Sequence, residues 1–184
     1  RDLHVEARRQ RQMCIRDSRY VMIKKVAIFG QTYSVQAEKE IKILLLALED
    51  HNIVVFFEEN FYNALKDFCH LTKTYSTFNS FHDLNSSFDV FFSLGGDGTI
   101  LRAITYIRDL NIPILGINMG RLGFLANVQK NAIKESIDLL IAEEYTIQER
   151  TLLSIKTNPK VKSLDELSFA LNEITIAREN TTSM

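Results

Sequence analysis

From residue 23 onward, short apolar runs alternate with segments in which apolar residues recur every three or four positions. Each run is bounded by turn residues and predicts a buried strand: 25–29, 53–57, 90–94 and 112–117. The segments between and after them have the apolar spacing of amphipathic helices: 37–48, 61–68, 100–107 and 133–141. Strands that alternate with helices predict a parallel sheet inside a three-layer α/β domain. We place this α/β domain at residues 22–144.

The pattern changes near residue 145. Residues 146–156 alternate like a half-exposed strand, and residues 167–178 predict another strand. No helical period follows, so we expect an all-β second domain to begin here and to occupy residues 145–184. This stretch is too short for an independent core, so we expect the chain to stop partway through that domain.

Two other segments fit neither pattern. Residues 72–87 are rich in Ser, Thr and Asn and predict a long loop. Residues 1–21 are rich in arginine and show no apolar stripe. We expect them to be a non-native or disordered extension ahead of Met22, and we exclude them from the fold.

Composition narrows the classes of function. The 184 residues are 46% hydrophobic and 24% charged, which is typical of a globular protein. A net charge of −1 gives no reason to expect a nucleic acid or an anionic membrane as partner. Cys14 and Cys69 form no spaced pair, which favours a reducing compartment, so we expect a cytoplasmic protein. The apolar runs are too short to span a membrane.

Candidate chemistry gathers where the 90–94 strand meets the next helix. Gly95, Gly96 and Gly98 surround one carboxylate, Asp97. Glycines allow a sharp turn and a close ligand, and the helix start that follows favours an anion such as phosphate. A carboxylate repels phosphate, so Asp97 needs another explanation. It could cap the helix, or it could be the base that takes a proton from a hydroxyl attacking a phosphoryl group.

Three motifs in order give a family resemblance. Gly95-Gly96-Asp97-Gly98-Thr99 resembles the signature that NAD kinases share with diacylglycerol and sphingoid lipid kinases and, more distantly, phosphofructokinases. Leu115-Gly-Ile-Asn-Met-Gly-Arg-Leu-Gly-Phe-Leu125 resembles the second glycine-rich segment of NAD kinases, and Asn172-Glu173 resembles their Asn-Glu pair. The resemblance runs from about residue 23 to the end of the chain.

The resemblance implies an α/β domain followed by a β-rich domain, with the site between them. It implies transfer of a phosphoryl group from ATP to the 2′-hydroxyl of the adenosine ribose of NAD, with Asp97 as the base. The other implied binding residues are Gly96, Gly98, Arg102, Phe124, Asn172 and Glu173. A divalent cation, Mg²⁺ in the usual case, would arrive on the nucleotide because the sequence shows no metal-ligand cluster. We also expect the full-length protein to form a homo-oligomer.

Simpler interpretations stay open for several of these residues. Arg102 could be a solvated surface arginine, and Phe124 could belong to the core. Asn172 and Glu173 could lie on an exposed edge, but the apolar alternation shifts phase there, which suggests a bulge that re-aims side chains.

Two other functions remain alternatives: a lipid kinase of the same superfamily and a non-catalytic dinucleotide-binding module. Segment 120–125 and the absence of an amphipathic basic face disfavour the lipid kinase. Because the cleft needs both domains, we expect the chain as given to be inactive as an enzyme.

Overall fold

The computed structural model describes residues 3–8, 22–31, 37–71, 73–120, 123–158, 161, 168–171 and 173–175. Contacts divide the chain into two compact units, each of which is considered separately. The larger unit is Gln12–Gln148, and the smaller one combines Arg1–Arg11 with Glu149–Met184.

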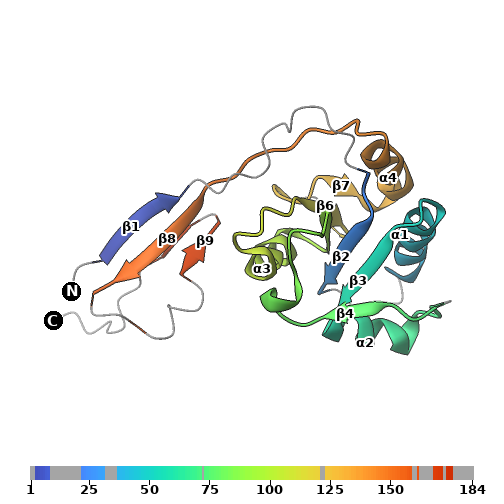
Figure 1. The fold of residues 1–184 in the computed structure, drawn as a ribbon, viewed down its shortest axis with the longest axis horizontal. Coiled ribbons are helices and arrows are strands. Elements are labelled where there is room, and N and C mark those ends of the chain that lie inside the picture. The colour runs from blue at the N-terminus through green and yellow to red at the C-terminus, as the bar shows by residue number, and fades with distance from the viewer. Residues whose placement is uncertain are drawn as a thin grey trace. The chain divides into compact units, whose positions relative to one another are not determined.

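The larger unit is built on a six-stranded sheet in the order β4-β3-β2-β5-β6-β7 (Figure 1). Every neighbouring pair in it is parallel. Its strands are β2 (Lys25–Gly30), β3 (Val54–Glu58), β4 (Ser76–Phe78), β5 (Val90–Leu94), β6 (Ile114–Asn118) and β7 (Val128–Gln129).

The strand order has a reversal at its centre. From β2 the chain moves outward through β3 to β4, then returns to the other side of β2 as β5 and continues to β6 and β7. In doubly wound sheets, ligands bind beyond the carboxyl ends of the strands that flank such a reversal. Gly30 and Leu94, the paired last residues of β2 and β5, mark this position.

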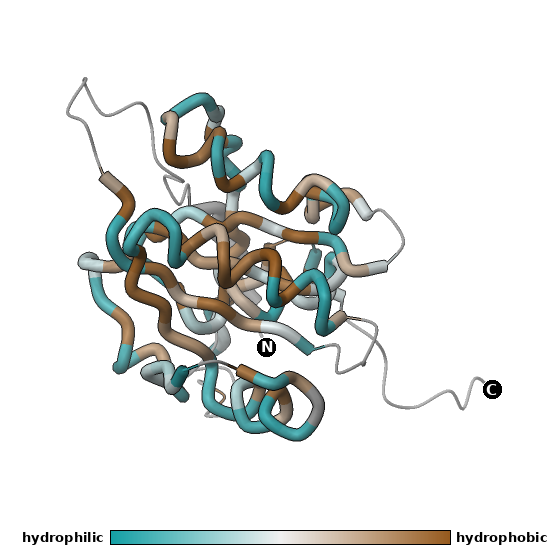
Figure 2. Tube along the Cα trace, turned by 90° about the vertical axis from the view of Figure 1, so that its right-hand side faces the viewer, coloured by the Kyte–Doolittle hydropathy of each residue, from teal (hydrophilic) through white to brown (hydrophobic). Residues whose placement is uncertain are grey.

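Helices cover both faces of the sheet, as Figure 1 shows for α3 on one side and α1 and α4 on the other. The helices are α1 (Glu38–Asp50), α2 (Glu59–Phe68), α3 (Asp97–Ile107) and α4 (Ile133–Ile141). Alternation along β2 supplies both cores: Val26 and Ile28 pack with α1, α2 and α4, whereas Ala27 and Phe29 pack on the α3 side. The central strands are accordingly among the most hydrophobic segments (Figure 2). The predicted three-layer α/β architecture is confirmed.

Two strands of this sheet lie where the sequence predicted none. The expected loop at 72–87 contains β4 and a 3₁₀ turn, Phe81–Asp83. The other is β7, which has only two residues. Both are edge strands, and neither has an apolar run of its own. They form because β3 and β6 offer unpaired backbone groups, a tertiary effect that hydrophobic periodicity does not report.

The smaller unit contains an antiparallel sheet in the order β1-β8-β9, as expected for a β-rich region. Its strands are β1 (Leu3–Arg8), β8 (Leu152–Thr157) and β9 (Phe169–Ala170). Residues 146–151 and 173–175 are not strand, so both strands are shorter than the sequence predicts.

The first strand corrects our exclusion of residues 1–21 from the fold. Residues 3–8 read Leu-His-Val-Glu-Ala-Arg, a strict apolar–polar alternation that the arginine-rich composition concealed. In the structure these six residues form β1 and pair with β8.

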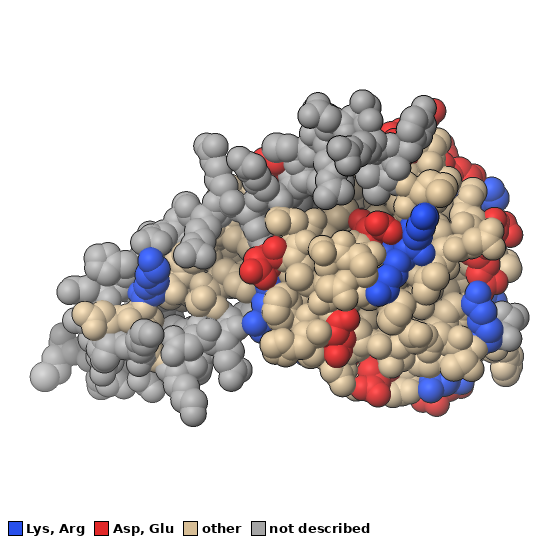
Figure 3. Space-filling view, in the orientation of Figure 1, with Lys and Arg blue, Asp and Glu red and all other residues tan. Residues whose placement is uncertain are grey.

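None of the described helices is long and apolar enough to cross a membrane. On the face of the larger unit visible in Figure 3, described acidic and basic side chains are interspersed rather than gathered by sign. The expectation about nucleic acid and membrane partners stays a prediction.

Candidate functional site

The junction between β5 and α3 is shaped by Gly95. Its φ of +156° is rarely adopted by residues with a side chain, and a Cβ there would collide with the side chain of Thr99. The Gly95 N–H donates to the Ile117 carbonyl of β6 (2.9 Å), which fixes the turn to the neighbouring strand. The chain therefore leaves β5 at the central reversal and enters α3 immediately.

Gly96 and Gly98 leave open space at the start of α3. Gly96 is the N-cap residue, both glycines are exposed, and a Cβ on either would meet nothing within 4 Å. The first N–H groups of a helix have no partner within that helix and favour an anion. This opening is compatible with a phosphate group, and the assignment of Gly96 and Gly98 to a phosphate stays a prediction.

Gly96 holds the N-cap position of α3, and Asp97 is the first residue of the helix. The Asp97 carboxylate accepts backbone hydrogen bonds from a distant segment: Phe124 N–H to Oδ2 (2.7 Å), Leu125 N–H to Oδ1 (2.9 Å) and Ala126 N–H to Oδ1 (3.2 Å). We call this set the carboxylate–loop contact.

Two glycines allow the distant segment to approach. A Cβ on Gly123 would collide with the Asp97 carboxylate. A Cβ on Gly116 in β6 would meet Ile100 at 2.5 Å and the Cα of Ala126 at 3.0 Å, so Ala126 lies directly against the strand. Segment 123–126 therefore contacts the rest of the fold at two points, Asp97 and β6.

Phe124 lies between these two points with its side chain 92% exposed. The alternative that it belongs to the core is thus wrong. An exposed aromatic ring beside a carboxylate and an open helix start can pack against a flat ligand group. The prediction that Phe124 lines a ligand site fits this placement and stays a prediction.

The remaining predicted residues are placed less fully. Arg102 is exposed on α3, the helix that Asp97 begins, which is compatible with both of its interpretations. Asn172 lies outside the described residues. Glu173 is exposed and belongs to the smaller unit. The structure thus brings together Gly96, Asp97, Gly98 and Phe124 within the larger unit.

Sequence reasoning missed the backbone donors of Leu125 and Ala126. Their side chains carry no signal, and only Gly123, which has no Cβ, indicates a close backbone approach. Asn118 falls at the carboxyl end of β6, as the strand pattern predicts; it is buried and accepts the Gly120 N–H on Oδ1 (2.8 Å). This short-range bond turns the chain into the second glycine segment.

A second carboxylate lies at the end of β3. Glu58 is only 3% exposed and caps α2, since its Oε2 accepts the Phe61 N–H (2.8 Å). Its Oε1 accepts from Asn60 Nδ2 (2.9 Å) and, at 3.5 Å, from the Tyr106 hydroxyl of α3. The described partners of Glu58 all belong to the fold, so this carboxylate has a structural role.

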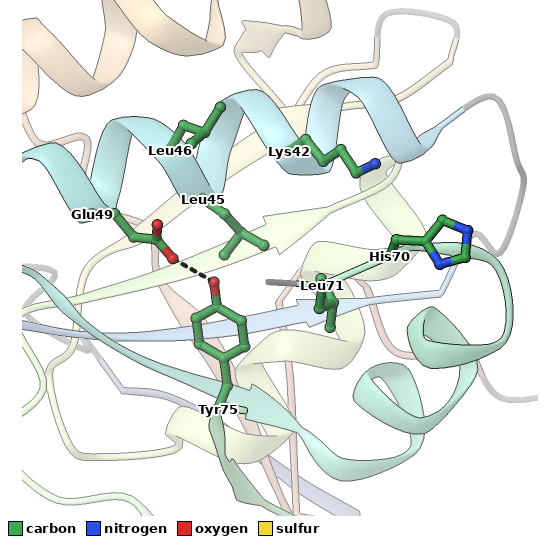
Figure 4. Close-up of a pocket in the computed structure, with 7 residues that line it drawn as sticks. All are labelled: Lys42, Leu45, Leu46, Glu49, His70, Leu71 and Tyr75. Carbon is green, nitrogen blue, oxygen red and sulfur yellow. Dashed lines mark hydrogen bonds between the residues drawn. The ribbon is translucent and has the colours of Figure 1, made fainter. Parts of the chain in front are cut away.

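A pocket on the α1 side of the sheet offers no comparable chemistry. Its volume is about 210 Å³, and it lies between α1 and the chain after α2 (Figure 4). Glu49 accepts from Tyr75 (2.7 Å) and pairs with Lys73 (2.8 Å), while Lys42 pairs with Glu38. Burial, with help from Glu49, raises the pKa of the Tyr75 hydroxyl, and Lys73 followed by Tyr75 lowers the pKa of Glu49. These polar groups already have partners.

No group of three or more His, Cys, Asp or Glu side chains that could hold a metal ion occurs among the residues that the structure describes. The described donor set at Asp97 is a single carboxylate already bonded to three amides. That a divalent cation arrives on the nucleotide stays a prediction.

Comparisons with known proteins identify a family. The family model described as the ATP-NAD kinase N-terminal domain matches residues 13–145. The NAD kinase of Flavobacterium psychrophilum is 47% identical over 160 residues, covering 87% of this chain and 54% of that protein. The NAD kinase of Bacteroides fragilis is 36% identical with the same coverage. The chain thus spans about half the length of the curated relatives it matches.

A solved structure supports the fold. The crystal structure of yeast NADH kinase complexed with NADH superposes with a TM-score of 0.58 at 19% identity. The match covers 71% of this chain and 41% of the yeast chain.

Proposed function

The chain belongs to the NAD kinase family, and we propose that it contributes to an enzyme that phosphorylates the 2′-hydroxyl of the adenosine ribose of NAD with ATP, giving NADP. The observation that carries this proposal is the placement of Asp97. Its carboxylate lies at the central reversal of the sheet, next to an open helix start and an exposed aromatic ring. That combination supports phosphoryl transfer to a hydroxyl, which depends chiefly on positioning and charge stabilisation.

Asp97 acts as the general base in this proposal. The ribose 2′-O–H bond breaks as its proton moves to a carboxylate oxygen. The ribose oxygen then bonds to the γ-phosphorus, and the bond from that phosphorus to the β–γ bridging oxygen breaks to release ADP. A positioned base contributes roughly 100- to 10,000-fold to such a step.

The other residues bind and orient the two substrates. The open space above Gly96 and Gly98 suits phosphate oxygens, and Arg102 would add a guanidinium that pairs well with phosphate. The Phe124 ring would contact the dinucleotide. Asn172 and Glu173 would hold ribose hydroxyls, since an amide and a carboxylate can donate to and accept from adjacent hydroxyls. The divalent cation is part of the nucleotide substrate.

The activity test uses a protein extended to the length of its relatives, made by joining this chain to the second half of the Flavobacterium psychrophilum enzyme. We expect NADP from NAD and ATP, and no phosphorylated diacylglycerol or sphingoid base. The matched control carries Asp97→Asn. NAD binding without any NADP formation would instead support a dinucleotide-binding module, in which the carboxylate–loop contact is purely structural.

Asn172→Ala and Glu173→Ala test the ribose assignment in the same protein. Each should weaken NAD binding by roughly 0.5–3 kcal/mol, the range for a lost hydrogen bond, and leave ATP binding nearly unchanged. Isothermal titration with each nucleotide measures both affinities. Equal weakening of both would assign the pair to the fold rather than to NAD.

A further inference from the structure

We propose that Asp97 is also a positioning residue: its carboxylate fixes segment 123–126 and thereby sets the place of the Phe124 ring beside the site. The importance of that ring for the dinucleotide rests on the proposed function, whereas the contact itself does not. The Asp97 side chain would then be both the base and the group that positions the Phe124 ring, although the two residues lie on separate glycine-rich segments.

The strength of the contact comes from its charge and number. Three backbone N–H groups, 27 to 29 residues away in sequence, converge on one carboxylate at 2.7 to 3.2 Å. Hydrogen bonds to a charged acceptor are roughly twice as strong as neutral ones. Such a set can hold a loop that lacks regular secondary structure.

The packing around the contact leaves the segment little room to move. Ala126 is fully buried against Gly116 of β6, and Gly123 has no space for a Cβ because the carboxylate occupies it. The backbone is therefore held at both ends of a short stretch, while the Phe124 side chain projects into solvent. An exposed ring on a fixed backbone is preorganised for a ligand, which lowers the entropy lost on binding.

This arrangement separates two kinds of change at the site. Asp97→Asn keeps the shape of the side chain but turns an amide NH₂ toward one or more of the three N–H donors, so the contact is weakened as well as the base. Gly123→Ala leaves the carboxylate chemically intact and displaces the segment. A base without a positioning role would be sensitive only to the first substitution.

The contact is tested on this 184-residue chain by NMR, with no ligand present. Trans-hydrogen-bond couplings should join the amide nitrogens of Phe124 and Leu125 to the Asp97 carboxyl carbon in the unsubstituted protein. Amide exchange at 124–126 should be slow, and at least ~10-fold faster in Asp97→Asn and in Gly123→Ala. The amide of Arg108, the C-cap residue of α3, donates to the Ile104 carbonyl (2.9 Å); it should keep its protection and serve as the internal standard of folding.

Gly120→Ala is the matched control, because it lies in the same segment and a Cβ there meets nothing within 4 Å. We expect exchange at 124–126 to stay within about twofold of the unsubstituted protein, since the contact is retained. Absence of the couplings, or unchanged exchange in both Asp97→Asn and Gly123→Ala, would overturn the proposal.

A binding measurement separates this proposal from the proposed function. In the protein extended to the length of its relatives, Gly123→Ala should raise the NAD dissociation constant ~10-fold, through displacement of Phe124. If the NMR results hold but no form of the protein binds NAD, the proposed function fails and the contact stands. If NAD binds equally well to Gly123→Ala, the link between Asp97 and the ring is refuted.

Discussion

The β3–α2 and β5–α3 junctions place similar carboxylates at the ends of two strands and use them differently. Glu58 is buried and bonds within its own junction, three residues along the chain, with Tyr106 as an outer neighbour. Asp97 is partly exposed, follows the N-cap Gly96 as the first residue of its helix, and accepts hydrogen bonds from a segment nearly 30 residues away. A carboxylate with local partners completes a helix. One with distant partners joins two loops and stays beside the solvent where a ligand can reach it.

The isosteric substitution Asp97→Asn gives the largest expected effect. In the protein extended to the length of its relatives, turnover should fall ~100-fold or more, the scale of general base catalysis. The fall in the midpoint of thermal unfolding should be a smaller effect, because the carboxylate–loop contact is weakened but water at this partly exposed site can replace the lost acceptor. Steady-state NADP formation and a thermal melt measure the two quantities. If the loss of turnover came with an equally large loss of stability, Asp97 would have a mainly structural role, as Glu58 does.

Glu58→Gln is the corresponding change at the other junction and should act on stability instead. An amide in place of the carboxylate directs an NH₂ toward either the Phe61 N–H or the Asn60 amide, leaving a buried donor without a partner. The cost is up to ~3 kcal/mol of unfolding free energy. Urea unfolding of this chain measures it. Asp97→Asn is the comparison and should lose less stability, because its site is partly exposed and that of Glu58 is buried. A Glu58→Gln protein of normal stability would contradict the buried cap.

Glycines near the two junctions, Gly30 at the end of β2 and Gly96 before α3, sharpen the comparison further. A Cβ on Gly30 would lie 2.5 Å from the buried ring of Phe61 in α2, so Gly30→Ala should destabilise the fold by about 1–2 kcal/mol through overpacking. A Cβ on Gly96 meets nothing within 4 Å, so Gly96→Ala should cost less, up to ~1 kcal/mol because alanine is a poorer N-cap residue than glycine, while still hindering a phosphate. Urea unfolding of the two variants measures both losses of stability. Equal destabilisation by Gly30→Ala and Gly96→Ala would refute the difference in packing.

A third carboxylate, Glu49, bonds to two side chains that can titrate, Tyr75 and Lys73, so its contribution to stability should depend on pH. The pKa of Tyr75 is raised above its usual 10.0, so its stabilising contribution is complete below pH 10.0 and is lost as pH rises further. The pKa of Glu49 is lowered from 4.5, so its contribution is lost as pH falls below that value. Tyr75→Phe should cost about 1 kcal/mol at neutral pH and remove the alkaline decline.

Thermal melts across pH measure this smallest effect. Lys73→Ala is the control, because it removes the other partner of Glu49 and should flatten the acid limb while leaving the alkaline limb in place. An alkaline decline that persists in Tyr75→Phe would assign it to another group.

The sequence by itself determined the α/β alternation, the parallel sheet and the glycine turn that holds Asp97. These follow from apolar periodicity and from backbone conformations that only glycine adopts readily, both of which are local. It also placed Gly96, Gly98 and Phe124 on the two segments that meet. The strands β4 and β7 escaped it because their pairing, rather than their own side chains, makes them strands. Strand β1 differs, because residues 3–8 do carry a local signal, an apolar–polar alternation within an arginine-rich segment.

Only the tertiary structure decided what Asp97 touches. The partners are backbone N–H groups, which every residue except proline carries, so no side-chain pattern could single out Leu125 or Ala126. They reach the carboxylate because the sheet places β6 beside β5 and because Gly116 and Gly123 leave room for the approach. For the same reason, only the tertiary structure distinguishes the two carboxylates: Glu58 caps the helix that follows it, whereas Asp97 contacts a segment distant in the chain.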